Sequence, residues 1–114
     1  MNIKSHQKWI KCLYQLKDGT LLSGSDDKTF NIWKNNQCLK TVKGHDQAVR
    51  SFCQVDDNHF ASGSFDKTIK IWDIRTLENV QKLEGHENTV ICIIKLKDNR
   101  LASCSNDKTI KIWE

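Results

Sequence analysis

The residues in this sequence that could do chemistry recur at fixed spacings. An aspartate follows a histidine by 21 positions and a tryptophan follows it by 27, in three sets: His6–Asp27–Trp33, His45–Asp66–Trp72 and His86–Asp107–Trp113. A serine precedes each aspartate by four positions, at Ser23, Ser62 and Ser103. Serine, histidine and aspartate are the components of a hydrolytic triad, in which the imidazole activates the serine hydroxyl.

The repetition itself argues against catalysis, because a catalytic set occurs once in a chain and this one occurs three times. The sequence contains no Gly-x-Ser-x-Gly turn, no glycine-rich phosphate loop and no zinc motif. The number of cysteines, five, is odd, and no two are spaced as Cys-x-x-Cys, so we interpret them as reduced thiols in a β core. We therefore expect no catalytic residues, no metal, no cofactor and no small-molecule substrate.

The sequence pattern predicts that the elements that position these residues are β-strands. Period-2 alternation, short turns and the lack of proline predict antiparallel meander sheets that repeat about every 40 residues. Four strands are expected in order in each repeat, except that the last repeat ends after its third. The predicted ranges are 9–16, 20–25, 29–33 and 37–42; 49–55, 59–64, 68–74 and 80–83; 90–96, 100–105 and 109–114.

Gly44-His45, then Ser62-Gly63-Ser64, then Asp66-Lys-Thr-Ile-Lys-Ile-Trp72-Asp73 resembles the WD-repeat family of β-propellers. The other repeats depart at tolerant positions, with Ser5, Lys34 and Glu114 in place of Gly, Asp and Asp. The resemblance implies an all-β partial β-propeller of three four-stranded antiparallel blades, the last lacking its own outer strand. Residues 1–114 form one segment, with repeats at about 4–34, 43–73 and 84–114.

The resemblance also implies a role for the recurring residues, which in this family are linked by hydrogen bonds inside each blade. The implied structural sets are His6–Ser23–Asp27–Trp33, His45–Ser62–Asp66–Trp72 and His86–Ser103–Asp107–Trp113. In such a set the serine hydroxyl accepts the indole N–H and donates to the imidazole, and the carboxylate fixes the histidine tautomer.

Partner contacts in this family gather three and five residues after the histidine and one before the aspartate. The resemblance carries a protein-binding role to Trp9, Lys11, Asp26, Arg50, Phe65, Ile91 and Asn106, with Ala48 and Thr89 in the remaining two positions. Trp9 is the one tryptophan outside the repeated third strand, so the framework does not require it. The alternative is that Trp9 packs on a neighbouring blade or chain.

Composition narrows the partner classes. The net charge is +4, but the lysines are spread along the chain rather than gathered in the dense basic stripe of a nucleic-acid groove. No apolar run approaches the roughly 18 residues of a membrane span, and the first residues lack the apolar core of a secretory signal. We expect an intracellular protein, cytoplasmic or nuclear, with proteins as partners and no membrane contact.

Three blades are fewer than the four to eight that usually close a propeller. We therefore expect a non-enzymatic protein–protein interaction scaffold, completed in one of two ways. Two copies could form a six-bladed ring as a homodimer, each lending residues 1–4 to the other, or the remaining blades could belong to a longer chain. A nucleic-acid-associated module and a substrate-receptor subunit of a larger enzyme assembly remain the alternative functions.

Overall fold

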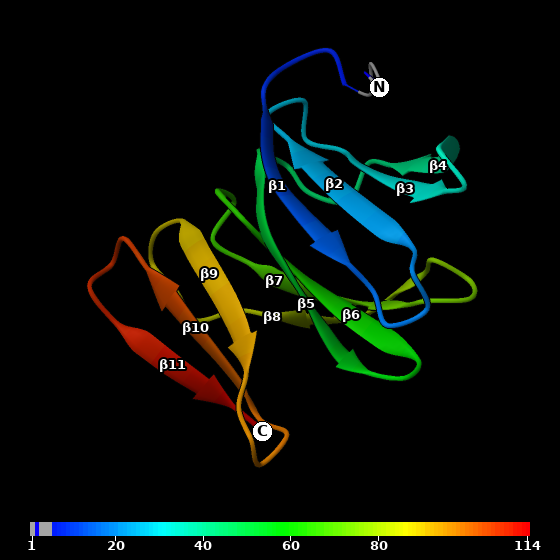
Figure 1. The fold of residues 1–114 in the computed structure, drawn as a ribbon. Helices are drawn as coiled ribbons and strands as arrows, with labels where there is room; N and C mark the ends of the chain where they lie inside the picture. Colours follow the sequence, from blue (N-terminus) through cyan, green and yellow to red (C-terminus); the bar gives the residue numbers. More distant parts are fainter. Residues whose placement is uncertain (1, 3–5) are drawn as a thin grey trace.

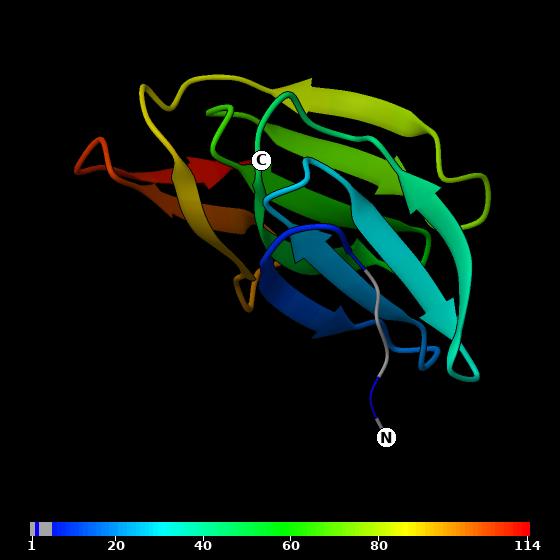
Figure 2. The same ribbon diagram turned by 90° about the horizontal axis from the view of Figure 1, so that it is seen from above.

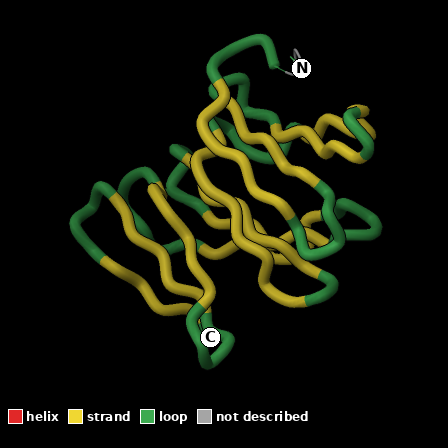
Figure 3. The backbone as a smooth tube through the Cα atoms, in the orientation of Figure 1, coloured by secondary structure: helices red, strands yellow, loops and turns green. Residues whose placement is uncertain are grey.

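The computed structural model describes residue 2 and residues 6–114. These form eleven strands joined by turns and loops (Figures 1 and 3). The strands are β1 (Ile10–Gln15), β2 (Leu21–Ser25), β3 (Phe30–Lys34), β4 (Gln37–Val42), β5 (Val49–Asp56), β6 (His59–Ser64), β7 (Ile69–Asp73), β8 (Asn79–Leu83), β9 (Val90–Lys95), β10 (Leu101–Ser105) and β11 (Ile110–Trp113). Each end lies within one residue of the end predicted from sequence.

The strands form three antiparallel sheets, which we call blades 1, 2 and 3. Blade 1 has the order β1-β2-β3-β4, blade 2 the order β5-β6-β7-β8, and blade 3 the order β9-β10-β11. The expected all-β fold is therefore confirmed, including a last blade of three strands. The segment expected to be lent to a second copy, residues 1–4, falls on Met1, Ile3 and Lys4, which lie outside the described residues, and on Asn2, which is not in a strand.

The innermost strands of the three blades lie beside one another, with β1 against β5 and β5 against β9. Blade 2 stands between the other two in both ribbon views (Figures 1 and 2). The outer strands β4 and β8 are mostly exposed, so the core lies between blades rather than inside any one of them.

A β-bulge near the start of each innermost strand decides which neighbour its side chains face. The pairing with the second strand skips one residue in every blade, at Lys11, Arg50 and Ile91. An extra residue reverses the alternation of the strand. As a result Val49 packs toward blade 1, whereas Ser51, two residues later, accepts a hydrogen bond from the backbone N–H of Ile93 in blade 3 at 3.1 Å.

Two hydrophobic clusters fill the two junctions between blades. The first joins Leu16, Leu22, Phe30 and Ile32 of blade 1 to Val49, Phe52, Phe60 and Trp72 of blade 2. The second joins Cys53, Ala61, Ile69 and Ile71 of blade 2 to Val90, Ile93 and Leu101 of blade 3, with Trp113 packed against it. Blade 2 thus buries both of its faces, one in each junction.

We name the two faces of a blade by the repeat positions that line them. The leading face, which packs on the preceding blade, is Val49, Phe52, Phe60 and Trp72 in blade 2. The trailing face, which packs on the following blade, is Cys53, Ala61, Ile69 and Ile71 in blade 2. Equivalent positions in the other blades are those at the same distance from the repeat histidine.

Glycine marks the point where two blades come closest. A Cβ atom placed on Gly63 would lie 2.8 Å from Val90 Cγ1, and one placed on Gly24 would lie 2.8 Å from Val49 Cγ1. Both distances are too short for two carbon atoms, so the trailing face needs a residue without a side chain at this position in blades 1 and 2.

We expect Gly63→Val to lower the free energy of unfolding by about 1–3 kcal/mol, the usual penalty for overpacking a core. Urea denaturation followed by circular dichroism measures the change. Thr41→Val on the exposed strand β4 is the control and should stay within about 0.5 kcal/mol of wild type. An unchanged midpoint for Gly63→Val would show that blades 2 and 3 do not approach so closely.

Candidate functional site

The structure brings the repeated residues of blade 2 into one continuous hydrogen-bond chain. The indole N–H of Trp72 donates to Ser62 Oγ at 2.8 Å, and Ser62 Oγ lies 2.7 Å from His45 Nε2. His45 Nδ1 lies 2.8 Å from Asp66 Oδ2. Since an ionised carboxylate can only accept, Nδ1 carries the proton and Nε2 accepts from the serine hydroxyl. Each polar side-chain atom in this series of four residues therefore has a hydrogen-bond partner.

Blades 1 and 3 contain the same series of hydrogen bonds, with nearly the same donor–acceptor distances. In blade 1 the indole–serine, serine–imidazole and imidazole–carboxylate distances are 2.9, 2.8 and 3.0 Å for Trp33, Ser23, His6 and Asp27. In blade 3 they are 2.8, 2.8 and 2.9 Å for Trp113, Ser103, His86 and Asp107. The twelve residues singled out by their spacing thus lie together in three sets of four.

Each aspartate of these sets also closes the turn that precedes the third strand. Asp66 Oδ1 accepts both the backbone N–H and the hydroxyl of Thr68, at 3.0 and 2.6 Å. Its other oxygen accepts the backbone N–H of Asp46 at 3.1 Å. The threonines of the other blades, Thr29 and Thr109, bind Asp27 and Asp107 in the same way.

These contacts set the ionisation of the aspartates. Burial by itself would raise the pKa of Asp66, but the hydrogen bonds from His45 and Thr68 outweigh it and hold this pKa well below the usual range. Burial also acts to raise the pKa of Asp27, and hydrogen bonds from Thr29 and His6 outweigh it, so this pKa is lowered as well. The Thr109 hydroxyl is the main cause of the lowered pKa of Asp107.

The geometry makes each set a brace for its blade. Ser23, Ser62 and Ser103 are at most 2% exposed, and each hydroxyl oxygen already receives an indole N–H. A nucleophilic serine must reach a substrate carbonyl, and these hydroxyls face the interior of the blade. The chain of bonds ties the third strand, the second strand and the loop before the first strand together.

The repeats match the family model described as "WD domain, G-beta repeat" over residues 1–34, 36–73 and 77–114. The chain belongs to the WD-repeat family. Proteins of this family are generally non-catalytic scaffolds for protein interactions. Comparison with the curated proteins found no match.

The solved structures that resemble the chain include a WD40 β-propeller domain and two designed proteins. It is similar to the WD40 β-propeller domain of Doa1, with 35% identity and a TM-score of 0.89, over 97% of this chain and 38% of that one. Two computationally designed proteins are also similar at 34% identity. Ika4 gives a TM-score of 0.81 over 95% of this chain and 67% of its own, and Ika8 gives 0.80 over 95% and 34%. The chain thus spans 38% of the length of the Doa1 domain.

The residues that the resemblance assigns to protein binding lie in pairs at one end of the WD blades. The backbone N–H of Asp26 donates to the Trp9 carbonyl at 2.9 Å, and Phe65 and Asn106 donate in the same way to Ala48 and Thr89. Ala48 and Thr89 are buried, which leaves Asn106 exposed and Phe65 half-buried as the side chains that reach the surface in those two pairs. Arg50 and Ile91 are the bulged residues of β5 and β9 and are half-buried.

Trp9 differs from its equivalents because its side chain points into solvent. It is 77% exposed, so it does not pack on the neighbouring blade of this chain. Its carbonyl is held from two sides, by the Asp26 N–H and by the Ser25 hydroxyl at 3.0 Å. Lys11 Nζ lies 5.4 Å from the centre of the indole ring and 3.7 Å from Asp26 Oδ2. We call Trp9, Lys11 and Asp26 the Trp9 cluster.

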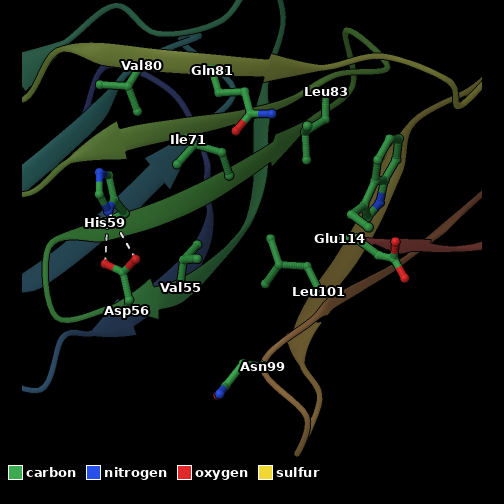
Figure 4. A pocket seen from close by; sticks show the side chains of 11 residues that line it. Val55, Asp56, His59, Ile71, Val80, Gln81, Leu83, Asn99, Leu101 and Glu114 are labelled. Carbon is green, nitrogen blue, oxygen red and sulfur yellow. Dashed lines mark hydrogen bonds and ion pairs between the residues drawn. The ribbon is translucent and has the colours of Figure 1, made fainter.

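A groove that the sequence did not predict opens between blades 2 and 3 (Figure 4). Its volume is about 270 Å³. Val55, Ile71 and Leu101 lie on its apolar side, and the ion pair of His59 Nδ1 with Asp56 Oδ1, 2.9 Å long, lies on its rim. One feature of the sequence could have indicated this groove: His59 is the one histidine outside the repeated position.

The interpretation of the cysteines as core residues is wrong for two of the five. Cys38 and Cys92 are exposed, because β4 is an outer strand and the trailing face of blade 3 has no blade against it within this chain. Cys53 is buried and Cys12 half-buried, and burial raises the pKa of the Cys12 thiol to about 11. Within residue 2 and residues 6–114, no group of three His, Cys, Asp or Glu side chains could hold a metal, and no helix is long and apolar enough to cross a membrane.

We expect His45→Ala to lower the free energy of unfolding by about 1–3 kcal/mol, because it leaves the buried Ser62 O–H without an acceptor and removes one of the two N–H donors to Asp66 Oδ2. Thermal unfolding followed by circular dichroism measures the change. His59→Ala removes an imidazole from an ion pair at the surface and should lower the stability by less than about 1 kcal/mol. Equal melting temperatures for His45→Ala and wild type would contradict a bracing role.

The lowered pKa of Asp66 makes the fold sensitive to acid. An unfolded aspartate has a pKa of about 3.9, so the ionised carboxylate stabilises the folded state above about pH 4. That stabilisation is lost as the pH falls through the lower pKa of the folded state. We expect Asp66→Asn to be less stable than wild type at neutral pH and to lose less stability between about pH 5 and pH 3. Urea denaturation midpoints of the two proteins, measured across this pH range, test the prediction. An equal fall of the midpoint with pH in both proteins would contradict a stabilising role of the ionised Asp66.

Proposed function

We propose that this chain is a non-enzymatic protein-interaction scaffold, a WD-repeat segment of a propeller that other blades complete. The Trp9 cluster is the observation that supports the proposal most. The framework does not need an indole at position 9, since Ala48 and Thr89 hold the equivalent places with the same backbone bond. A large aromatic side chain kept in solvent is the kind of residue that anchors protein interfaces.

The surroundings of Trp9 suit an anchor. Its backbone is fixed by the Ser25 hydroxyl and the Asp26 N–H, so little order has to be gained there on binding. The ammonium of Lys11 between the indole face and the Asp26 carboxylate provides charged groups at the edge of the apolar surface. A partner for this cluster offers an apolar pocket for the indole, bordered by groups that pair with the two charges.

We expect Trp9→Ala to abolish the capture of proteins that the immobilised wild-type chain retains from a native cell extract. Leu39→Ala is the matched control, since Leu39 is also a largely exposed apolar residue and lies on β4, away from the cluster. Both variants should keep the melting temperature of wild type. Retention of the same proteins by Trp9→Ala and wild type, compared by mass spectrometry, would refute the proposal.

A further inference from the structure

A second groove lies between blades 1 and 2, each of which has four strands in this chain. Its volume is about 270 Å³. Among its lining residues, Leu16 and Ile32 are buried, whereas Leu39 of β4 is exposed. Leu16 and Trp9 lie at opposite ends of β1, so the groove is separate from the Trp9 cluster. Both of its walls belong to this chain.

On the blade 2 side, the groove includes a loop that breaks the repeat. Five residues, 74–78, join β7 to β8, whereas two residues join β3 to β4. Asp73 Oδ1 accepts the backbone N–H groups of Arg75 and Thr76 at 2.8 and 2.9 Å. The Leu77 N–H donates to the Asp73 carbonyl at 2.9 Å, and Leu77 has a φ of 60°, in the left-handed region that a leucine rarely adopts. Rare backbone conformations of this kind are concentrated at ligand-binding sites, and here the loop holds Arg75 and Leu77 on the groove.

The charged side chains that line the groove are Asp18, Lys34 and Arg75. Asp18 Oδ1 accepts the backbone N–H of Thr20 at 2.8 Å. Hydrogen bonds from Thr20 are the main cause of the lowered pKa of Asp18, and the positive charge of Lys34 lowers it further. The charges of Asp18 and Lys34 therefore offset each other, whereas the Arg75 guanidinium forms no ion pair with the residues that the structure describes. The groove has a net positive charge and a guanidinium whose donors are available.

The groove between blades 2 and 3 has a similar apolar wall but a different charge. Its volume is also about 270 Å³, and Ile71 there occupies the repeat position of Ile32. Its ionisable lining residues are Asp56, His59 and Glu114, and none of the described residues that line it is a lysine or an arginine. The two grooves therefore differ in the sign of their charge more than in their size, so a charged ligand can distinguish them.

We propose that the groove between blades 1 and 2 binds a small molecule with an apolar body and one carboxylate, its body against Leu39 and Leu77 and its carboxylate on Arg75. A dry cavity of about 150 Å³ holds the six carbons of benzene, so this groove has room for roughly ten non-hydrogen atoms. A guanidinium pairs with a carboxylate through two parallel hydrogen bonds, which fixes the orientation of the ligand. The apolar lining favours such a molecule over a purely polar anion.

The test uses 3-phenylpropanoate as the probe, with the corresponding alcohol and amine, which share its apolar body, as controls. Each is titrated into the ¹⁵N-labelled 114-residue chain, and the amide chemical shifts are followed. We expect the carboxylate to bind with a dissociation constant of about 1 mM, as suits so small a ligand, and at least about tenfold more tightly than the amine. Saturable shifts should appear at Leu39 and Leu77 and not at Gln81 and Trp113, which line the groove between blades 2 and 3.

Two variants separate the charge from the apolar wall. Arg75→Glu should weaken the binding of 3-phenylpropanoate at least about tenfold and make the amine the tighter ligand. Lys97→Glu changes the net charge equally, at an exposed position between β9 and β10, and should bind as wild type does. Leu77→Gly keeps the loop folded, because glycine readily adopts a φ of 60°, and should weaken the carboxylate and the alcohol by the same factor.

Other outcomes overturn the inference. Wild type that shows no saturable shifts, or that binds the carboxylate and the amine equally, has no site for such an anion. Equal weakening by Arg75→Glu and Lys97→Glu means that only the net charge of the chain matters, and inorganic phosphate binding as tightly as 3-phenylpropanoate means that the apolar wall does not contribute. Larger shifts at Gln81 and Trp113 place the ligand in the other groove. The Trp9 cluster contributes no residue to this site, so the inference and the proposed function are tested independently.

Discussion

A blade of this kind can bury its apolar side chains only against another blade. Each sheet is one layer thick and apolar on both faces, so the core of the molecule consists of the junctions between sheets. The bulges at Lys11, Arg50 and Ile91 serve this constraint, because they turn residues two positions apart on one innermost strand toward opposite blades. The same constraint explains why blades 1 and 3 expose large apolar side chains whose equivalents in blade 2 are buried.

Packing between blades requires that each blade be stiff, and the His–Ser–Asp–Trp sets provide stiffness. A buried indole N–H, a hydroxyl and an imidazole would each destabilise the blade if left without a partner. Linked in series and ended by a carboxylate, they satisfy one another. The residue types match those of a hydrolytic triad, but here the serine hydroxyl is enclosed beneath the indole that donates to it. Positions outside the sets are not fixed by this network, as at Trp9, where Ala48 and Thr89 hold the equivalent places.

The sequence was sufficient for the fold and for the strand boundaries because the His, Asp and Trp spacings repeat without a gap. It was less informative where a feature depends on how blades meet. The bulges leave no mark in the residue types, since Lys, Arg and Ile all occupy them. The exposure of Cys92 follows from its place on a face with no neighbouring blade within this chain, although the equivalent Ser51 is buried in a junction. The groove beside Asp56 and His59 also arises between two blades, and neither residue belongs to the repeated pattern.

The account depends most on the claim that the apolar core lies in the junctions between blades rather than inside each blade. Native-state amide hydrogen exchange of the 114-residue chain tests this claim directly. The account predicts that the amides of β5 and β6, in the blade that is covered on both faces, exchange more slowly than those of the equivalent strands in blades 1 and 3. Equal protection of the three blades would contradict it.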